Sequence, residues 1–323
     1  MKPPVIAVVG PTASGKSALA VALARRLDGE IISCDSMAVY RGMDIGTAKP
    51  SPDDLAAVPH HMIDVADPND EFSASDFADA AIPFAYDILS RGKLPIFCGG
   101  TGLYLDAVLF GGASGAPEAE PDPALRASLL SDAEKYGAED LWRRLNAVDP
   151  ESAASIHPNN IKRVARALEI YLTTGKTKSE ADRASSRRRP SPFMFIKIMP
   201  DRPREQLYVR IDERVDIMFR EGLGGEVEGL LRAGKLRRGT ASQAIGYKEI
   251  VAALDAGLPA ESAADAIKNA TRRYAKRQLT WFSSDPSLKK LDMNPSGDGN
   301  FEVIVNNALK LLTFDSFCDI IKK

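Results

Sequence analysis

The sequence contains few of the residues that build disulfide frameworks, metal centres and membrane spans. It has three cysteines and three histidines in 323 residues, without the spacing of a metal site. The pair His60 and His61, and His157, are therefore expected to cap loops or to pack. No apolar run reaches the roughly 18–20 residues that span a bilayer, and the first one ends at Gly10, too early for a secretory leader. We expect a monomer of the reducing cytoplasm, with no membrane contact.

The net charge of −2 lacks the strong positive excess of many nucleic-acid-binding proteins. The charge is unevenly distributed, however, with 8 basic against 16 acidic residues through residue 120 and 34 against 28 thereafter. The basic residues concentrate in three runs, which are Arg183–Arg189, Arg232–Arg238 and Lys268–Arg277. Such runs are either solvated surface or contacts with an anionic partner.

Short apolar segments alternate with helical patterns in the first hundred residues. Val5–Gly10, Glu30–Cys34 and Leu94–Cys98 are apolar and bounded by turn residues, which predicts buried strands. Ala18–Leu27 and Ser75–Arg91 have the composition or periodicity of helices. This alternation predicts an α/β fold with a parallel sheet and helices on both faces.

The middle of the chain changes character. Gly111–Pro121 is rich in Gly, Ala, Pro and Glu and is predicted to be a linker, and Ser185–Pro192 is a second break. Between these breaks the patterns are all helical, and after them Phe193–Met199 is again strand-like, followed by helices from Arg202 to Phe282. The residues after Phe282 are predicted to form one further strand and one further helix.

We therefore predict an α/β, P-loop NTPase-like parallel-sheet core with a helical insertion domain and a helical C-terminal part. The predicted divisions are 1–115 for the first part of the core, 116–190 for the insertion, and 191–323 for the completion of the core and the C-terminal helices.

One motif identifies a phosphate-binding loop. The residues are Gly10, Pro11, Thr12, Ala13, Ser14, Gly15, Lys16 and Ser17, which fit G-x-x-x-x-G-K-[ST] between a predicted strand and a helix. Backbone N–H groups and the helix N-terminus surround an anion in such a loop, and the lysine adds a charge. The Ser17 hydroxyl is a candidate ligand for Mg²⁺.

Two polar residues follow the other predicted strands. Asp35 ends the second strand, and Thr101 lies in the Gly-rich turn after the third. Because ligands bind beyond the carboxyl ends of parallel strands, we expect both near the P-loop. Each could instead only cap a following helix.

Together these motifs resemble the tRNA dimethylallyltransferase (tRNA isopentenyltransferase) family. The resemblance rests on eight blocks in order, which are Gly10–Ser17, Asp35–Pro50, Pro59–Asp64, Gly99–Tyr104, His157–Ile170, Tyr208–Arg214, Gln243–Glu249 and Ala270–Phe282. Many members have Thr in place of Ser17 and Gln in place of Ala38.

The resemblance implies transfer of a dimethylallyl group from dimethylallyl diphosphate to N6 of the adenosine 3′-adjacent to the anticodon, in tRNAs that read codons starting with U. It implies that Asp35 is the general base, that Thr101 holds the adenine or the leaving group, and that Arg210 contacts the diphosphate. The P-loop and Mg²⁺ would then hold a leaving group rather than ATP.

The resemblance also implies a tRNA anticodon stem-loop as partner, bound by the insertion domain with the target base extruded. The implied tRNA contacts are Asp35, Ser36, Met37, Ala38, Thr101, Arg126, Asn159, Asn160, Ile161, Lys162, Arg163, Arg166, Gln243, Gly246 and Lys248. Helical spacing places Asn160, Arg163 and Arg166 along one face, although such a face is often only solvated.

Three alternatives share parts of this pattern. A small-molecule or nucleotide kinase would use the P-loop with ATP but leaves the insertion unexplained. An isopentenyltransferase of free adenine nucleotides would need no insertion for tRNA. A non-catalytic RNA-binding protein would not need the set Lys16, Ser17, Asp35 and Thr101.

Overall fold

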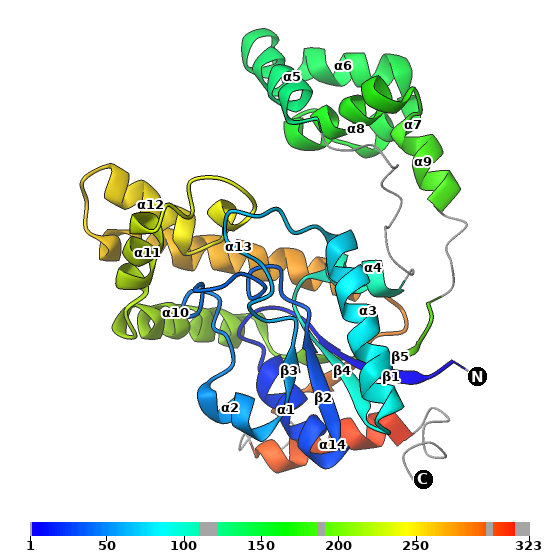
Figure 1. Cartoon of the computed structure of the whole chain (residues 1–323), viewed down its shortest axis with the longest axis vertical. Coiled ribbons are helices and arrows are strands. Elements are labelled where there is room, and N and C mark those ends of the chain that lie inside the picture. Colours follow the sequence, from blue (N-terminus) through cyan, green and yellow to red (C-terminus); the bar gives the residue numbers. More distant parts are fainter. Residues whose placement is uncertain (1, 110–121, 186–190, 295–299, 314–323) are drawn as a thin grey trace. The chain divides into compact units, whose positions relative to one another are not determined.

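The computed structural model describes residues 2–109, 122–185, 191–294 and 300–313. The chain divides into two compact units, one made of residues 1–112 and 191–323 and the other of residues 113–190 (Figure 1). The whole of the predicted linker 111–121, most of the break 185–192 and Cys318 lie outside the described residues. Each unit has its own hydrophobic core and is described by itself.

The first unit is built on a six-stranded sheet in which every pair of strands is parallel, as predicted. The strands are β1 (Pro4–Val9), β2 (Gly29–Ser33), β3 (His60–His61), β4 (Leu94–Gly99), β5 (Met194–Asp201) and β6 (Lys289–Asp292). Their order across the sheet is β3-β2-β4-β1-β5-β6. Strand β5, which follows the second unit in sequence, pairs directly with β1, so both parts of the chain complete one sheet.

Helices cover both faces of this sheet. The helices of this unit are α1 (Lys16–Arg26), α2 (Pro52–Ala57), α3 (Ala74–Ser90), α4 (Gly102–Leu109), α10 (Arg204–Arg220), α11 (Leu223–Arg232), α12 (Tyr247–Asp255), α13 (Ala264–Ser283) and α14 (Phe301–Thr313), with the 3₁₀ turns η1 (Ala241–Gln243) and η2 (Ala260–Ala263). In β1, Ile6 packs in one core with Leu19 of α1, and the neighbouring Val5 packs in another core with Phe77 of α3. This alternation is the period of a strand buried on both faces.

The second unit is entirely helical in its described residues. It contains α5 (Pro123–Tyr136), α6 (Ala138–Val148), α7 (Pro150–Ser155), α8 (Ile161–Thr174) and α9 (Lys178–Ser185). Leucines and valines of α5, α6 and α8 form its core, and Trp142 packs there while its indole donates hydrogen bonds to the carbonyls of Ala153 (3.0 Å) and Ile156 (2.9 Å). Within the described residues no helix has the length and apolar content needed to cross a bilayer.

The short strand β3 was not predicted, because it consists of His60 and His61, which were expected to cap loops or to pack. It forms beside β2, where Ile31 pairs with His60. His60 Nδ1 donates to the Val58 carbonyl (2.8 Å), and His61 Nε2 lies 2.9 Å from Glu30 Oε2. Trp281 of α13 lies against Gly102 of α4 and is 42% exposed.

Glu30 holds an ion-pair cluster at the start of β2. Its buried carboxylate accepts hydrogen bonds from Arg91 and His61, and Lys93 Nζ lies 3.2 Å from Oε1. The hydrogen bonds from Arg91, followed by those from His61 and Lys93, lower the pKa of Glu30 to about 2 against the cost of burial. The charged carboxylate is therefore the form that stabilises the fold.

We expect Glu30→Gln to lower the free energy of unfolding at pH 7 by about 3 kcal/mol, the scale of a broken buried pair. Because the folded pKa is depressed, the contribution of Glu30 is present above about pH 4.5 and is lost as the pH falls toward 2. Urea unfolding at pH 7 and at pH 3 measures both effects. The free energy of unfolding should fall less from pH 7 to pH 3 in the variant than in wild type. Glu221→Gln, at an exposed position, is the control. If both variants lose the same free energy of unfolding, Glu30 does not stabilise the fold through its buried ion pairs.

Candidate active site

The motif Gly10–Ser17 forms the turn between β1 and α1, as predicted. Gly10 and Gly15 have φ angles of +139° and +98°, a region that favours glycine. Lys16 Nζ lies 3.3 Å from the Pro11 carbonyl, to which it donates a hydrogen bond. Burial lowers the pKa of Lys16, because a desolvated ammonium is costly. A bound anion would offset that cost, which is the situation expected in a phosphate-binding loop.

Three arginines from distant segments contact this loop. Arg202 follows β5, and Arg210 and Arg214 lie one turn apart on α10. Their contacts run from Arg202 Nε to Ser14 O (3.0 Å), from Arg210 Nε to Ala13 O (2.9 Å) and from Arg214 Nη1 to Thr12 Oγ1 (3.1 Å). Burial is the main cause that lowers the pKa of Arg202 and of Arg214. Four cationic groups around one loop make a site for an anion.

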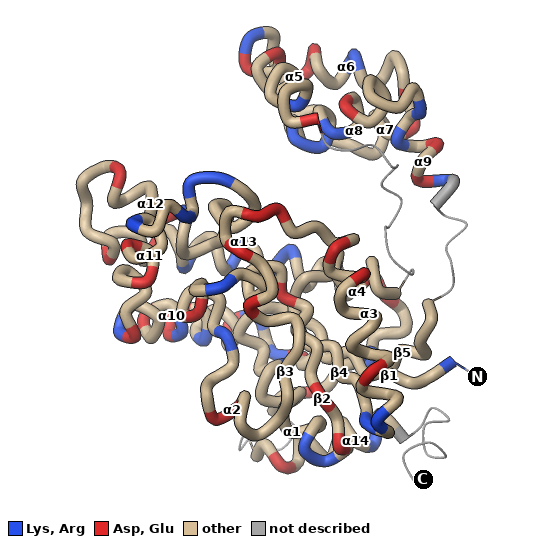
Figure 2. The backbone as a smooth tube through the Cα atoms, in the orientation of Figure 1, with Lys and Arg blue, Asp and Glu red and all other residues tan. Residues whose placement is uncertain are grey.

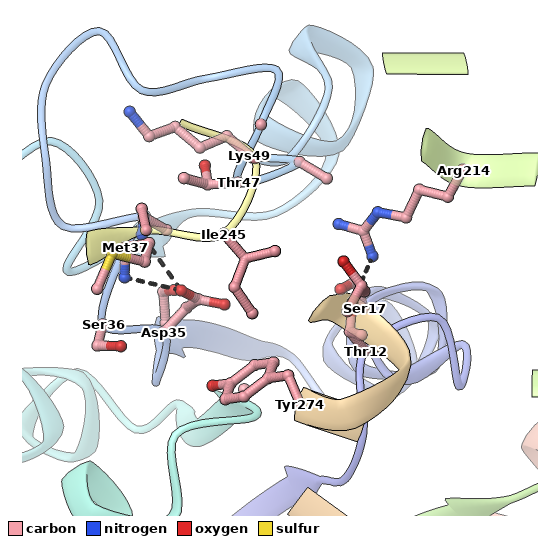
Figure 3. Close-up of a pocket in the computed structure, with 18 of the residues that line it drawn as sticks. Thr12, Ser17, Asp35, Ser36, Met37, Thr47, Lys49, Arg214, Ile245 and Tyr274 are labelled. Carbon is pink, nitrogen blue, oxygen red and sulfur yellow. Dashed lines mark hydrogen bonds between the residues drawn. The ribbon is translucent and has the colours of Figure 1, made fainter. Parts of the chain in front are cut away.

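Of these arginines the sequence analysis named only Arg210, whose side chain is exposed. Arg214 is more enclosed and lines the pocket that Figure 3 shows, called the main pocket below, so it joins the candidate site. The available signal was the four-residue spacing of Arg210 and Arg214, which places both on one helix face. Arg202 carried no such signal, because its position depends on where β5 ends beside the loop.

Asp35 lies beyond the end of β2, opposite the P-loop across the pocket (Figure 3). Its Oδ1 accepts hydrogen bonds from the backbone N–H groups of Met37 (2.9 Å) and Ala38 (3.3 Å). These bonds close a turn after Asp35 and do not cap a helix, because the next helix, α2, begins only at Pro52. No hydrogen bond within the described part of the chain involves Oδ2, which leaves this oxygen able to accept a proton from a ligand.

Thr101 joins the loops that follow β2 and β4. Its Oγ1 accepts a hydrogen bond from the Ser36 N–H (3.0 Å) and donates one to Ser36 Oγ (3.3 Å). This contact is possible because β2 and β4 are neighbours, with Ser33 paired to Cys98. Thr101 thus fixes the loop that carries Asp35.

The pocket between these groups has a volume of about 410 Å³. Ser17 and Arg214 line it on one side and Asp35 on the other, with Ile245 between them (Figure 3). Lys16 also lines this pocket. The predicted residues Ser36, Met37, Ala38, Gln243, Gly246 and Lys248 also line it. A second hollow of about 420 Å³ lies beside the P-loop and shares Lys16, Ser17, Ala48 and Arg214 with the first. Arg210 lines this second hollow.

Helix α13 contributes two residues that the sequence analysis missed. Gln278 is buried, accepts a hydrogen bond from the Thr12 N–H (2.9 Å) and donates one to the Gly100 carbonyl (2.9 Å). Tyr274 lines the pocket, and burial raises its pKa to about 12, so the phenol stays neutral. Both residues lie in the block Ala270–Phe282, where the basic residues were the apparent candidates for contacts with an anionic partner.

The basic run 268–277 is partly neutralised by α10. Lys268 Nζ lies 2.6 Å from Asp216 Oδ1, and Arg272 Nη2 lies 2.5 Å from Asp212 Oδ2. Figure 2 shows basic and acidic residues interspersed along α10 and α11. Arg277 remains at the pocket, with its guanidinium carbon 5.5 Å from the centre of the Tyr274 ring.

The remaining predicted RNA contacts lie in the helical unit. Asn159, Asn160, Lys162 and Arg163 are exposed at the start of α8, with Ile161 partly exposed beside them. Arg126 and Arg166 instead share the buried Glu169. Arg126 Nε donates to Glu169 Oε2 (2.8 Å), and Arg166 Nη1 lies 2.9 Å from Oε1. These two arginines therefore have an internal partner as well as an exposed side.

The comparison with known families identifies the chain. The family model described as IPP transferase matches residues 38–285. The chain belongs to the IPP transferase family. A second model, described as Isopentenyl transferase, matches residues 3–66, which include the P-loop and Asp35. The two matches together span both sides of the pocket.

Curated relatives of this IPP transferase match over nearly their whole length. The tRNA dimethylallyltransferase of Halalkalibacterium halodurans is 47% identical, covering 91% of this chain and 92% of the relative. The tRNA dimethylallyltransferase of Geobacillus thermodenitrificans is 48% identical, with 90% of each chain covered.

Two solved structures are also similar. The tRNA isopentenylpyrophosphate transferase of Bacillus halodurans has a TM-score of 0.70 at 42% identity, covering 98% of this chain and 99% of that one. A eukaryotic dimethylallyltransferase acting on tRNA has a TM-score of 0.77 at 27% identity, covering 96% of this chain and 80% of that one.

The donor set of this IPP transferase fits a magnesium ion bound mainly through a substrate. The Ser17 hydroxyl lines the pocket beside Lys16, as in loops where the metal is shared with phosphate oxygens and waters. Among the described residues no group of three or more His, Cys, Asp or Glu could hold a metal. A dedicated all-protein metal cage is therefore not part of the described chain, whereas a phosphate-shared site is compatible with it.

Proposed function

We propose that the protein transfers a dimethylallyl group from dimethylallyl diphosphate to N6 of the adenosine 3′-adjacent to the anticodon of tRNA. The observation that carries the proposal is one pocket with a cationic P-loop on one side and the open oxygen of Asp35 on the other. Relatives named tRNA dimethylallyltransferase support the choice of substrates. The resemblance restricts the proposed substrates to tRNAs that read codons starting with U.

The P-loop side would bind the diphosphate of the donor. Backbone N–H groups, Lys16 and Arg214 surround an anion there, and Arg210 would contact it from the outer hollow. Mg²⁺, with Ser17 as its protein ligand, would supply further neutralisation of the diphosphate charge. Stabilising the leaving group is the main electrostatic requirement of displacement at an allylic carbon.

The Asp35 side would receive the adenine. N6 attacks C1 of the dimethylallyl group, the C1–O bond breaks, and its electron pair leaves with the diphosphate. Asp35 Oδ2 accepts the proton that N6 loses, because an aromatic amine is a weak nucleophile until that proton is removed. Thr101 keeps the Asp35 loop in place through Ser36. The neutral Tyr274 adds an aromatic wall beside the base.

The helical unit 113–190 is proposed to bind the anticodon stem-loop while the target base enters the pocket. Its exposed polar residues at the start of α8 offer amide and cationic contacts to a single-stranded loop. Gln243, Gly246 and Lys248 would contact the base or its neighbours at the pocket itself. We further propose that the protein is a monomer and that it works in the reducing cytoplasm, where free thiols such as Cys34 and Cys98 are stable.

The test incubates the protein with labelled dimethylallyl diphosphate and Mg²⁺ in four reactions. Three contain an acceptor, which is unmodified tRNA, the same tRNA with guanosine at the target position, or AMP, and the fourth contains none. We expect label only on the unmodified tRNA, and only at N6 of the target adenosine. Label on AMP would indicate an enzyme of free nucleotides. A parallel arm with labelled ATP would reveal phosphoryl transfer, and either result would overturn the proposal.

A further inference from the structure

A single helical turn follows β2 and forms part of the pocket wall. Its backbone closes with hydrogen bonds from the Ala48 N–H to the Ile45 carbonyl (2.9 Å) and from the Lys49 N–H to the Asp44 carbonyl (3.1 Å). Ala48 has a φ of +49°, the left-handed conformation that ends such turns. Like any helical turn, it begins with N–H groups that have no partner inside the turn.

Glu226 of α11 supplies that partner from a distance of about 180 residues along the chain. Its Oε2 accepts hydrogen bonds from the N–H groups of Asp44 (3.0 Å) and Ile45 (2.8 Å), and its Oε1 accepts one from Gly46 (3.2 Å). A carboxylate is the strongest acceptor for such N–H groups, because the bonds are charge-assisted. The position of the turn therefore depends on α11.

The same carboxylate also holds Tyr247. The Tyr247 hydroxyl donates to Glu226 Oε1 at 2.5 Å, and its ring is fully buried. A Cβ on Gly46 would fall 2.5 Å from this ring, so the turn packs against Tyr247 as closely as a backbone can. Tyr247 begins α12 directly after the pocket-lining segment 243–246.

One carboxylate thus joins two walls of the active-site pocket. Gly46, Thr47, Ala48 and Lys49 line the main pocket from the turn, and Ala48 also lines the outer hollow beside Ser17 and Arg214. The turn therefore faces the space next to the P-loop, where the donor is proposed to bind. Glu226 itself lines neither hollow.

We infer that Glu226 is a positioning residue for the prenyl donor, acting through the turn 44–49 and Tyr247. The inference rests on the proposed prenyl transfer. A carboxylate with two oxygens satisfies all four donors, whereas an amide has one acceptor oxygen and would turn an NH₂ group toward the remaining N–H or O–H groups. Losing these bonds lets the turn move away from the P-loop and leaves the donor less well held.

Glu226→Gln should raise KM for dimethylallyl diphosphate by about tenfold, while KM for tRNA and kcat change by less than about twofold. Tyr247→Phe removes one of the four bonds and should raise the same KM by about threefold. Glu228→Gln is the matched control, since Glu228 lies on the same helix, is exposed and pairs only with Arg232 (3.6 Å) among the described residues. Steady-state kinetics with each substrate varied in turn, together with thermal melting of every variant, give the comparison.

A selective rise in the donor KM with a melting temperature close to wild type supports the inference. Equal changes in both KM values, or none in Glu226→Gln, would overturn it. If Glu226→Gln does not fold, the milder Tyr247→Phe decides between the same outcomes. Failure of wild type to transfer label to tRNA would instead refute the proposed function, so the two failures are distinguishable.

Discussion

Asp35→Ala is expected to lower the single-turnover rate of transfer to tRNA by about 10²–10⁴, the range contributed by a positioned acid–base group. The reason is that Oδ2 is the carboxylate oxygen available to N6 at the pocket. The affinity for tRNA should change little, because the base is bound mostly by other groups. Single-turnover kinetics at saturating donor measure the rate of the chemical step, and a separate binding titration measures the affinity.

Asp35→Asn separates the two roles of this side chain. An amide oxygen can still accept hydrogen bonds from the Met37 and Ala38 N–H groups, as Oδ1 does now, so the loop keeps its conformation. The amide cannot take up a proton under these conditions. We therefore expect Asp35→Asn to be nearly as slow as Asp35→Ala. Wild-type turnover in the asparagine variant would show that Asp35 only shapes the loop.

Arg214→Gln is expected to lower kcat/KM for dimethylallyl diphosphate by about 10²–10³, as for loss of one preorganised donor to a developing charge. Arg214 lines both hollows and bonds to Thr12 of the P-loop, so it reaches the site of the leaving group. The effect should appear in both parameters, with a raised donor KM and a lowered kcat. Kinetics with the donor varied at saturating tRNA measure it.

Arg210→Gln provides the comparison on the same helix. Its guanidinium is exposed and lines only the outer hollow of the two. Exposed charges interact more weakly with a ligand because water screens them. We expect kcat/KM for the donor to fall by about tenfold, again through a raised donor KM and a lowered kcat. If kcat/KM falls further in Arg210→Gln than in Arg214→Gln, the expectation that the more buried arginine contributes more would be wrong.

The parts of the site that the sequence predicted are those set by local chemistry. A run of apolar residues followed by Gly10–Ser17 specifies a strand, a tight turn and a helix start within one short segment. Asp35 was found because it follows a strand whose end must lie at the ligand-binding edge of a parallel sheet. The same reasoning applied to Thr101, and the structure joins it to the Asp35 loop through Ser36.

The parts that were missed depend on partners remote in sequence. Gln278 reaches Thr12 across 266 residues, and Glu226 reaches the turn 44–49 across about 180. Neither residue type is distinctive within its helix, and the partners are backbone groups, which every residue has. Strand β3 is another example, since two histidines become a strand only because β2 offers an edge to pair with.

The sequence by itself determined the phosphate-binding loop and the alternation of strands and helices, because each follows from contacts within a few residues. It also predicted that Asp35 lies at the ligand-binding edge of the sheet, because Asp35 directly follows a strand. The tertiary structure decided the strand order, the greater burial of Arg214 than of Arg210, and the carboxylate that joins two walls of the pocket. These depend on which surfaces are buried against one another. Burial changes the free energy of a charge far more than its neighbours in sequence do, and only the folded chain specifies which groups are buried.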